Sequence, residues 1–411
     1  MESGQSLAMA LQPDGSVRAG AQGCYSAVRW GMVLAADGQP AFTLAPSASI
    51  TEQFGRRGPR SSPHPDGVWA VALVGRDLYV GGRFSKINGV PAHNIARWDG
   101  RAWHSLGSEP HSGLNGVVES LAVVGKTLYA MGDFDRAGET EAFFLAAWDG
   151  QRWSSLGWGE GNAHDNLFIK TMTAAGSDLY VGGEFARAGS VAAHNLARWD
   201  GRQWHALGPS IPDALSDNVH LLASWGELLY AEGDAAHNPN PNAIQAACWN
   251  RKSSTWQLLP PVELFPVDSA AHAFATDLVA TDSALYMSYR AFTAHAHHNG
   301  LLRWNGRVWA RLGETGPNGR GIFALAAADD AVCVAGNFKQ IGGTAACNVA
   351  RWSHNHWEAL QADFDWDSAI TGVVCALAIR GRRVYAGGML RPFVASWNGA
   401  KWAQLPPTSR K

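Results

Sequence analysis

The sequence predicts an all-β fold assembled from one repeated unit. Residues 94–107 read Asn-Ile-Ala-Arg-Trp-Asp-Gly-Arg-Ala-Trp-His-Ser-Leu-Gly, and this stretch returns in recognisable form along the chain. The composition agrees, because 46 Gly, 19 Trp and 17% charged residues in a chain of 411 are typical of many short strands joined by tight turns. A period that runs from end to end favours one continuous array over two or three separate domains.

Each copy of this stretch reads as a β-hairpin. Residues around Trp98 alternate as a strand does, Trp103 begins the return strand, and Asp-Gly between them marks a tight turn. We expect Asp99 and Gly100 to be the two central residues of a primed turn, both with positive φ. Trp98 and Trp103 then lie close together, where an aromatic pair adds roughly 0.5–1.5 kcal/mol beyond its burial. The tryptophans therefore serve packing first.

The complete repeat contains four strands, as residues 119–124, 128–131, 144–148 and 152–156 illustrate. Paired tryptophans recur seven times, with 45–55 residues between successive first members. The N-terminal segment reads as an eighth, eroded unit. The units lie near residues 5–45, 67–107, 117–157, 168–208, 218–260, 274–313, 321–361 and 373–406.

Units of this kind bury their faces only against their neighbours, and closure into a ring removes the exposed ends. The sequence therefore predicts a single β-propeller over residues 1–411, with eight four-stranded blades. Seven blades are the alternative, since the first unit is the least regular.

Two segments resemble known bacterial repeats. Residues 179–189 and 195–208 are similar to the Gly-Gly-x-Phe and Trp-Asp-Gly repeats of bacterial β-propeller proteins, and residues 11–15 resemble the related delta-60 repeat. The resemblance implies the fold and leaves the activity open, because propellers host enzymes, lectins and scaffolds alike. A more distant likeness, of architecture alone, is to propeller enzymes of natural-product pathways such as those that alkylate and close cyclophanes.

The net charge limits the classes of binding partner, and the cysteine pattern indicates the redox state. A net charge of −2 and a pI near 6.7, with no Lys/Arg run, argue against nucleic acid and anionic membrane surfaces. We find no basic leader and no apolar stretch of 18 residues, so we expect a cytoplasmic protein. Five scattered cysteines without a C-x-x-C motif are expected to be reduced and buried.

One position of the predicted inner strands is unusually varied. Aligned on their turns, the units place there Leu7, Trp69, Glu119, Lys170, His220, Thr276, Phe323 and Cys375. Glu119, Lys170 and His220 fall on three consecutive units, among otherwise small or aliphatic residues, and such departures from the local pattern are expected at functional sites. We interpret them as a catalytic group able to accept and donate a proton. The alternative is an ion pair between Glu119 and Lys170 that ties two blades, with His220 as a hydrogen-bonding neighbour.

A second ring follows the Gly-Gly of each unit. It contains Gln22, Arg83, Asp133, Glu184, Asp234, Arg290, Asn337 and Met389. Arg83 and Arg290 are candidate substrate anchors, because a guanidinium offers a fork of donors to carboxylate or phosphate. For Arg83, pairing with Asp133 or Glu184 is the alternative. The remaining candidate substrate-binding residues are Trp69, Phe323, Tyr289 and His272.

Metal and nucleotide chemistry are not predicted. His295, His297 and His298 are candidate ligands on one loop, but no acid lies at ligand spacing, so we expect no metal and no other cofactor. The acidic loop 363–367 starts like a calcium loop and lacks the Gly and Glu that an EF-hand needs at its sixth and twelfth positions. No nucleophile elbow, P-loop, dinucleotide fingerprint or zincin motif is present.

These observations lead to three hypotheses. The first is an intracellular propeller of bacterial specialised metabolism that binds a small organic molecule at its loop-rich rim, as a cofactor-independent enzyme of acid/base, cyclisation or alkylation type. Irregular loops in the units that begin near His220 and Thr276 favour it. The second is a scaffold that binds a protein partner, which predicts an exposed apolar patch on the rim. The third is a lectin, in which the recurring tryptophans would form sugar-stacking platforms.

Overall fold

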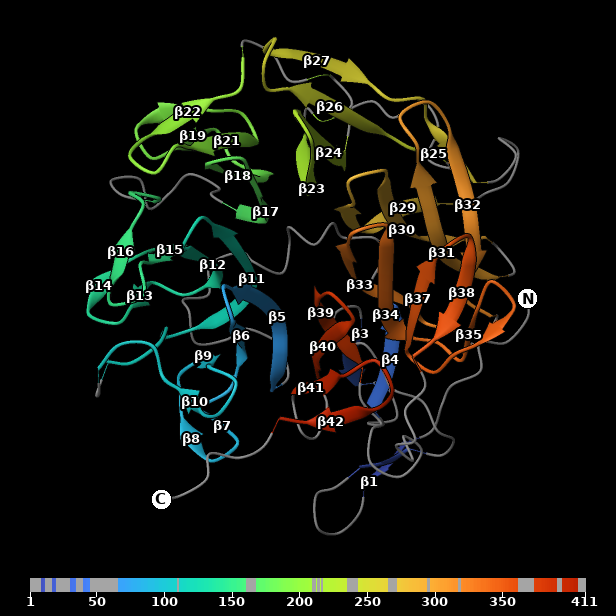
Figure 1. The fold of residues 1–411 in the computed structure, drawn as a ribbon, viewed down its shortest axis with the longest axis horizontal. Helices are drawn as coiled ribbons and strands as arrows, with labels where there is room; N and C mark the ends of the chain where they lie inside the picture. Colours follow the sequence, from blue (N-terminus) through green and yellow to red (C-terminus); the bar gives the residue numbers. More distant parts are fainter. Residues whose placement is uncertain are drawn as a thin grey trace. The chain divides into compact units, whose positions relative to one another are not determined.

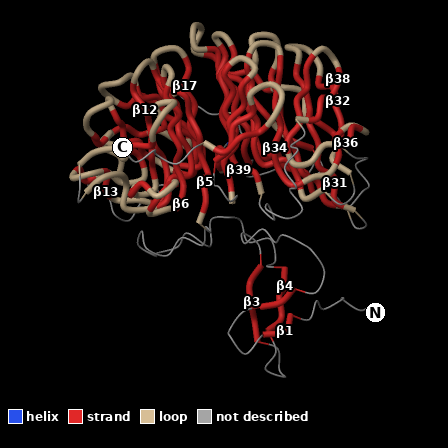
Figure 2. Tube along the Cα trace, turned by 60° about the horizontal axis from the view of Figure 1, so that its bottom comes forward, coloured by secondary structure: helices blue, strands red, loops and turns tan. Residues whose placement is uncertain are grey.

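The computed structural model divides the chain into two compact units, Met1–Pro65 and Asp66–Lys411. The structure describes residues 66–108, 111–159, 168–208, 212, 215, 217–234, 243–264, 272–293, 296–316, 319–360, 373–389 and 394–405, and the backbone of four strands before residue 45. No α-helix is present among these residues, and nothing helical among them is long and apolar enough to cross a membrane (Figure 2).

The second unit contains seven antiparallel four-stranded sheets, each formed by one contiguous stretch of chain. Blades one to four are β5 (Gly67–Val74), β6 (Asp77–Arg83), β9 (Ile95–Trp98) and β10 (Trp103–His104); β11 (Val117–Val124), β12 (Thr127–Asp133), β15 (Leu145–Trp148) and β16 (Trp153–Ser155); β17 (Phe168–Ala175), β18 (Asp178–Glu184), β21 (Leu196–Trp199) and β22 (Trp204–Ala206); and β23 (Asn218–Trp225), β24 (Leu228–Asp234), β26 (Ala246–Asn250) and β27 (Thr255–Leu258).

Blades five to seven complete the set. They are β29 (His272–Ala280), β30 (Leu285–Phe292), β31 (His297–Trp304) and β32 (Trp309–Glu314); β33 (Gly321–Ala328), β34 (Ala331–Asn337), β37 (Val349–Ser353) and β38 (His356–Ala359); and β39 (Val374–Arg380), β40 (Arg383–Gly388), β41 (Val394–Trp397) and β42 (Trp402–Gln404). Two-stranded ladders accompany the connecting loops: β7 (Lys86–Ile87) with β8 (Val90–Pro91), β13 (Arg136–Ala137) with β14 (Thr140–Glu141), β19 (Arg187–Ala188) with β20 (Val191–Ala192), β25 (Ala243–Ile244) with β28 (Val262–Glu263), and β35 (Gln340–Ile341) with β36 (Thr344–Ala345).

The seven sheets close into a ring, so the prediction of a single β-propeller fold is confirmed. The first strand of each blade packs against the first strand of the next, and β39 packs against β5 to complete the circle. Figure 1 shows these first strands at the centre and the fourth strands at the periphery. Because the second-to-third and fourth-to-first connections share one face, we call it the loop-rich face. The opposite face, which carries the two-residue turns, is the turn face.

The prediction of eight blades is wrong, and the alternative of seven is correct. The segment assigned to the eighth unit forms two separate hairpins, β1 (Met9–Leu11) with β2 (Val17–Ala19) and β3 (Trp30–Leu34) with β4 (Pro40–Leu44). No four-stranded sheet forms from these strands, and β39 already meets β5. Leu7 and Gln22, which were aligned with the two rings, lie outside the described residues.

The Asp-Gly turn differs from the expected one. Trp98 pairs with Trp103, and the Asp99 amide donates to the Ala102 carbonyl, so Gly100 and Arg101 are the central residues. Of these, Gly100 has a positive φ of 96°, the pattern of a turn with Gly at the first central position. The Asp99 carboxylate instead accepts hydrogen bonds from the amides of Ala102 and Arg101 at 2.8 Å, which hold its pKa well below the usual range.

The paired tryptophans are structural, as the sequence indicated. Trp98 and Trp103 lie 5.4 Å apart between ring centroids and are 5% and 3% exposed. In three blades the second tryptophan also donates to a leucine carbonyl at or near the end of the fourth strand of the preceding blade: Trp204 to Leu156 at 2.7 Å, Trp357 to Leu312 at 3.0 Å, and Trp402 to Leu360 at 3.0 Å. The hydrophobic core accordingly lies between adjacent blades, where aliphatic side chains of both sheets meet.

Candidate functional site

The varied position of the inner strands is a β-bulge in every blade. The ladder between first and second strands slips by one residue at Trp69, Glu119, Lys170, His220, Thr276, Phe323 and Cys375. A bulge places two residues opposite one and breaks the alternation of side chains, which re-aims the extra side chain. The seven residues aligned from the sequence therefore occupy one equivalent structural position near the loop-rich face.

In six blades the bulge requires a glycine at the second position of the Gly-Gly motif. The second glycine pairs with the residue that precedes the bulge, as Gly183 does with Ile169. A Cβ at Gly183 would overlap the carbonyl oxygen of Phe168, and the equivalent glycine in five other blades meets the same obstacle. The motif that carried the resemblance thus secures the geometry that presents the bulge residue.

All seven bulge residues are partly exposed, whereas most of their preceding neighbours are buried. Val118 and Val219, for example, are 0% exposed, while the Glu119 and His220 that follow them keep accessible surface. Glu119, Lys170 and His220 stand on the first strands of blades two, three and four, and these strands pack side by side. The three groups thus occupy matching positions on consecutive strands.

Blade five departs from the repeat at the bulge. Ser288 and Tyr289 replace the Gly-Gly pair, with Ala275 opposite Tyr289 and Asp277 opposite Ser288. The second and third strands remain paired as far as Phe292, so this blade carries a longer hairpin toward the loop-rich face than the others. The irregularity noted in the sequence around residues 286–299 is therefore an extended hairpin.

Arg290 and Phe323 are brought together across blades five and six. The Arg290 guanidinium lies 5.6 Å from the centroid of Phe323, the bulge residue of blade six, and 5.9 Å from that of Phe292. It donates to the Asn299 side-chain oxygen at 3.2 Å and to the Arg320 carbonyl. These partners occupy several of its donors and hold the Arg290 guanidinium over the Phe323 ring.

Further aromatic rings extend this cluster along blade five. Phe274 stacks on Phe292 at 5.9 Å, and His297 meets the edge of Phe292 at 4.8 Å. Apolar rings with a fixed guanidinium between them form a surface suited to a planar ligand ring.

Four other predicted binding residues take no part in the contact between Arg290 and Phe323. Tyr289 is 1% exposed and donates to Glu314 at 2.9 Å on the other side of the sheet from Arg290, and burial raises its pKa. Arg83 lies 3.6 Å from Asp66 in an exposed ion pair. His272 begins β29 and is exposed, and Trp69 stands on blade one, separated from Phe323 by blade seven.

The histidines predicted as candidate metal ligands do not point toward one another. His297 contacts Phe292, whereas His298 lies 3.3 Å from Glu314. Successive residues of a strand point to opposite faces of its sheet, so these two imidazoles do not converge. His295 and the acidic loop 363–367 lie outside the described residues, and within the described part no group of three metal-ligating side chains occurs.

Asp277 is a site residue that the sequence reasoning missed. It follows the bulge of blade five and accepts hydrogen bonds from the amides of Leu325 at 2.6 Å and Leu278 at 2.7 Å. Burial raises its pKa to about 6, although both amide hydrogen bonds lower it. The sequence could have indicated Asp277, because the equivalent residues of the other blades are all uncharged: Ala70, Ser120, Thr171, Leu221, Ala324 and Ala376.

A cavity of about 310 Å³ lies on the turn face, between blades five and six, away from the ring of bulges. It was not anticipated from the sequence.

Comparison with known proteins supports the fold. No family model and no curated protein matches the chain. Among solved structures, a puromycin-hydrolyzing peptidase of Mycobacterium tuberculosis has a TM-score of 0.52 at 11% identity, over 84% of this chain and 53% of that one. The chain therefore spans about half of the peptidase's length. A computationally designed protein, Ika8, matches with a TM-score of 0.46 at 15% identity, over 82% and 85% of the two chains. YCF48 of Cyanidioschyzon merolae matches with 0.46 at 12% identity, over 82% and 97%. At such identities the likeness concerns the fold alone, and the chain is a β-propeller with seven blades.

Proposed function

We propose that this propeller binds a small organic molecule at its loop-rich face, against the ring of bulge residues. One observation carries the proposal: the fold builds the same bulge seven times, and the chain places a different kind of side chain at each. A repeat under structural demands alone would be expected to keep one residue type at one position. Unequal side chains at equivalent positions make the ring asymmetric, as recognition of a specific molecule requires.

The chemistry of the ring divides into two parts. Blades two to four supply Glu119, Lys170 and His220, which can exchange protons with a bound molecule. Blades five and six supply the rings around Arg290 and Phe323, which can hold a planar portion. We propose on this basis an enzyme of acid/base type, in which positioning and proton transfer provide the catalysis. The active groups belong to the protein itself.

No specific observation supports the two alternatives, a protein-binding scaffold and a lectin. Among the described residues only Leu258 and Val308 are large exposed hydrophobics, and they lie on an outer strand and in a turn, so they do not form a docking patch on the loop-rich face. A lectin would need tryptophan rings open to solvent, whereas Trp148 and Trp153 are each 6% exposed.

Ligand-observed NMR with a library of ring-containing amines, phenols and carboxylic acids tests the proposal. We expect compounds that bind the wild type and lose at least tenfold in affinity in the variant Glu119→Gln/Lys170→Met/His220→Asn. The control variant Arg307→Gln, altered at an exposed position of the turn face, should bind as the wild type does. Binding that survives the triple substitution would contradict the proposal.

A further inference from the structure

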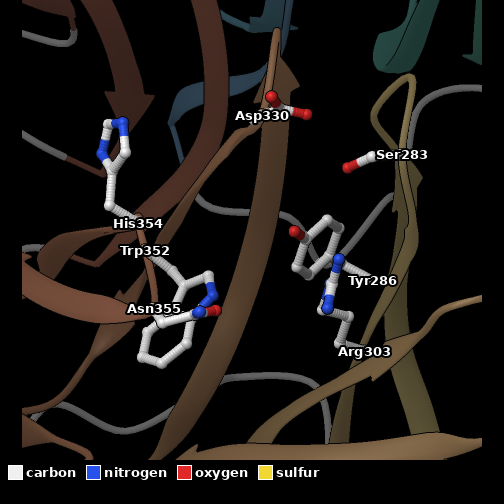
Figure 3. A pocket seen from close by; sticks show the side chains of 7 residues that line it. All are labelled: Ser283, Tyr286, Arg303, Asp330, Trp352, His354 and Asn355. Carbon is white, nitrogen blue, oxygen red and sulfur yellow. The ribbon is translucent and has the colours of Figure 1, made fainter.

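The cavity on the turn face is built from two adjacent blades. Blade five contributes Tyr286 and Arg303, and blade six contributes Asp330, Trp352 and Asn355. Figure 3 shows Arg303 beside Tyr286 on one side, with Trp352 and Asn355 facing them and Asp330 at one end. Its volume of about 310 Å³ lies at the lower limit of small-molecule sites.

Arg303 lacks the acidic partner that Arg97 and Arg198 have in blades one and three. The strand register makes it equivalent to Arg97 and Arg198, since all three directly precede the first tryptophan and pair with the tyrosine of the second strand. Arg97 forms an ion pair with Asp77 at 3.1 Å, and Arg198 forms one with Asp178 at 3.0 Å.

The residue equivalent to Asp77 and Asp178 in blade five is Ala284, one position before the strand leucine that pairs with the tryptophan. Among the residues that the structure describes, the Arg303 side chain has neither an ion-pair nor a hydrogen-bond partner, and it borders the cavity. A guanidinium that is partly buried without a carboxylate is a ready-made site for an anion.

Blade six differs from the repeat at the same place. Its third-to-fourth turn has His354 and Asn355 as central residues with φ of 50° and 60°, whereas blades one, two, three, five and seven carry a Gly with positive φ there. Trp352 keeps accessible surface in the cavity, as the equivalent Trp199 of blade three also does, whereas Trp98 and Trp304 are only 5% and 6% exposed. Departures in two blades thus meet at one cavity.

We propose that this cavity binds a small zwitterion of the amino-acid type with an aromatic side chain. The carboxylate would pair with Arg303, the ring would lie against Trp352 and Tyr286, and the ammonium group would approach Asp330. The site is separate from the ring of bulge residues, so it does not depend on the function proposed there.

Three probes separate these contributions in isothermal titration calorimetry. L-Phenylalanine carries both charges, 3-phenylpropanoate lacks the ammonium group, and phenethylamine lacks the carboxylate. We expect L-phenylalanine to bind more tightly than either analogue. Arg303→Gln should weaken its binding about tenfold or more, because a charge-assisted hydrogen bond is lost. Asp330→Asn should weaken L-phenylalanine and leave 3-phenylpropanoate unchanged.

Ala284→Asp offers a complementary test, because it restores the acid of blades one and three without removing Arg303. It should close the site to L-phenylalanine, provided that the variant keeps the wild-type unfolding temperature. Arg97→Gln is the matched control and should leave binding unchanged. The proposal fails if the wild type binds none of the probes at 10 mM, if 3-phenylpropanoate binds as well as L-phenylalanine, or if Arg303→Gln binds as the wild type does.

Discussion

The Asp277 carboxylate of blade five accepts a hydrogen bond of 2.6 Å from the backbone amide of Leu325 in blade six. The same relation joins blades three and four, where the Thr171 hydroxyl accepts from the Leu222 amide at 3.2 Å. In both cases the acceptor directly follows a bulge. A carboxylate in this place is costly to ionise, and burial raises the pKa of Asp277 to about 6.

This pKa predicts a pH dependence of stability. Because the folded-state pKa lies above the ordinary value of 3.8, the folded protein holds the proton more tightly than the unfolded chain. The stabilisation from this group is therefore complete below about pH 4, and it is lost as the pH rises through 6. The loss should be roughly 3 kcal/mol.

Urea unfolding of wild type and Asp277→Asn between pH 4 and 8 measures this effect. The stability of the wild type relative to the variant should fall between pH 4 and 6 and stay constant above pH 7. Asp282→Asn, at an exposed turn position of the same blade, should show no such slope. A pH-independent difference between wild type and Asp277→Asn would refute the assignment.

The tryptophan hydrogen bond between blades predicts a difference between two matched variants. Trp204→Phe removes the hydrogen bond to the Leu156 carbonyl, whereas the equivalent Trp153 has a buried indole nitrogen without a hydrogen-bond partner among the described residues. Trp204→Phe and Trp153→Phe lose the same ring volume. Trp204→Phe should cost about 1 kcal/mol more in the free energy of unfolding, because it leaves a carbonyl unsatisfied. Equal losses in denaturant titrations would show that the hydrogen bond contributes nothing.

A third prediction concerns the second glycine of the Gly-Gly motif, which lies opposite the bulge. Gly183→Ala places a Cβ against the Phe168 carbonyl and should cost at least about 3 kcal/mol, since backbone must move. Gly125→Ala introduces a residue at φ of 62° in open space, where the strain is roughly 1–2 kcal/mol. Thermal unfolding should rank the variants in this order. The reverse ranking would mean that the bulge adjusts easily.

The ring of bulge residues predicts a separation between binding and stability. Glu119→Gln and His220→Asn replace partly exposed side chains with uncharged polar ones of equal or smaller size, so each should change the free energy of unfolding by less than about 1 kcal/mol. Either variant should nevertheless weaken binding of a ligand found for the loop-rich face. A large loss of stability in chemical denaturation would instead support the alternative of groups that tie the blades together.

The sequence predicts much of this architecture because each repeat carries its own register. Paired tryptophans and Gly-Gly align the units, and this alignment places Glu119 and its equivalents at one structural position. The number of blades could not be read from local patterns, since the first 45 residues resemble a unit without forming a four-stranded sheet. Ring closure depends on the contact of β39 with β5, which no single repeat encodes.

The individual side chains of the site were harder to predict. Tyr289 and Arg290 are neighbours in the chain but point to opposite faces of the sheet, and only the register of blade five decides which one meets Phe323. Asp277 could have been found by comparing each position across units, because its equivalents are all uncharged. The opening around Arg303 arises from packing between two blades, which the sequence does not display.

A crystallographic soak of the full chain with ring-containing amines and carboxylic acids tests whether the ring of bulge residues is a ligand site. We expect a molecule bound on the loop-rich face in contact with Glu119, Lys170 or His220, with its ring directed toward Phe323. Molecules bound only in the cavity beside Arg303, or none bound at all, would contradict a ligand site at the ring of bulges.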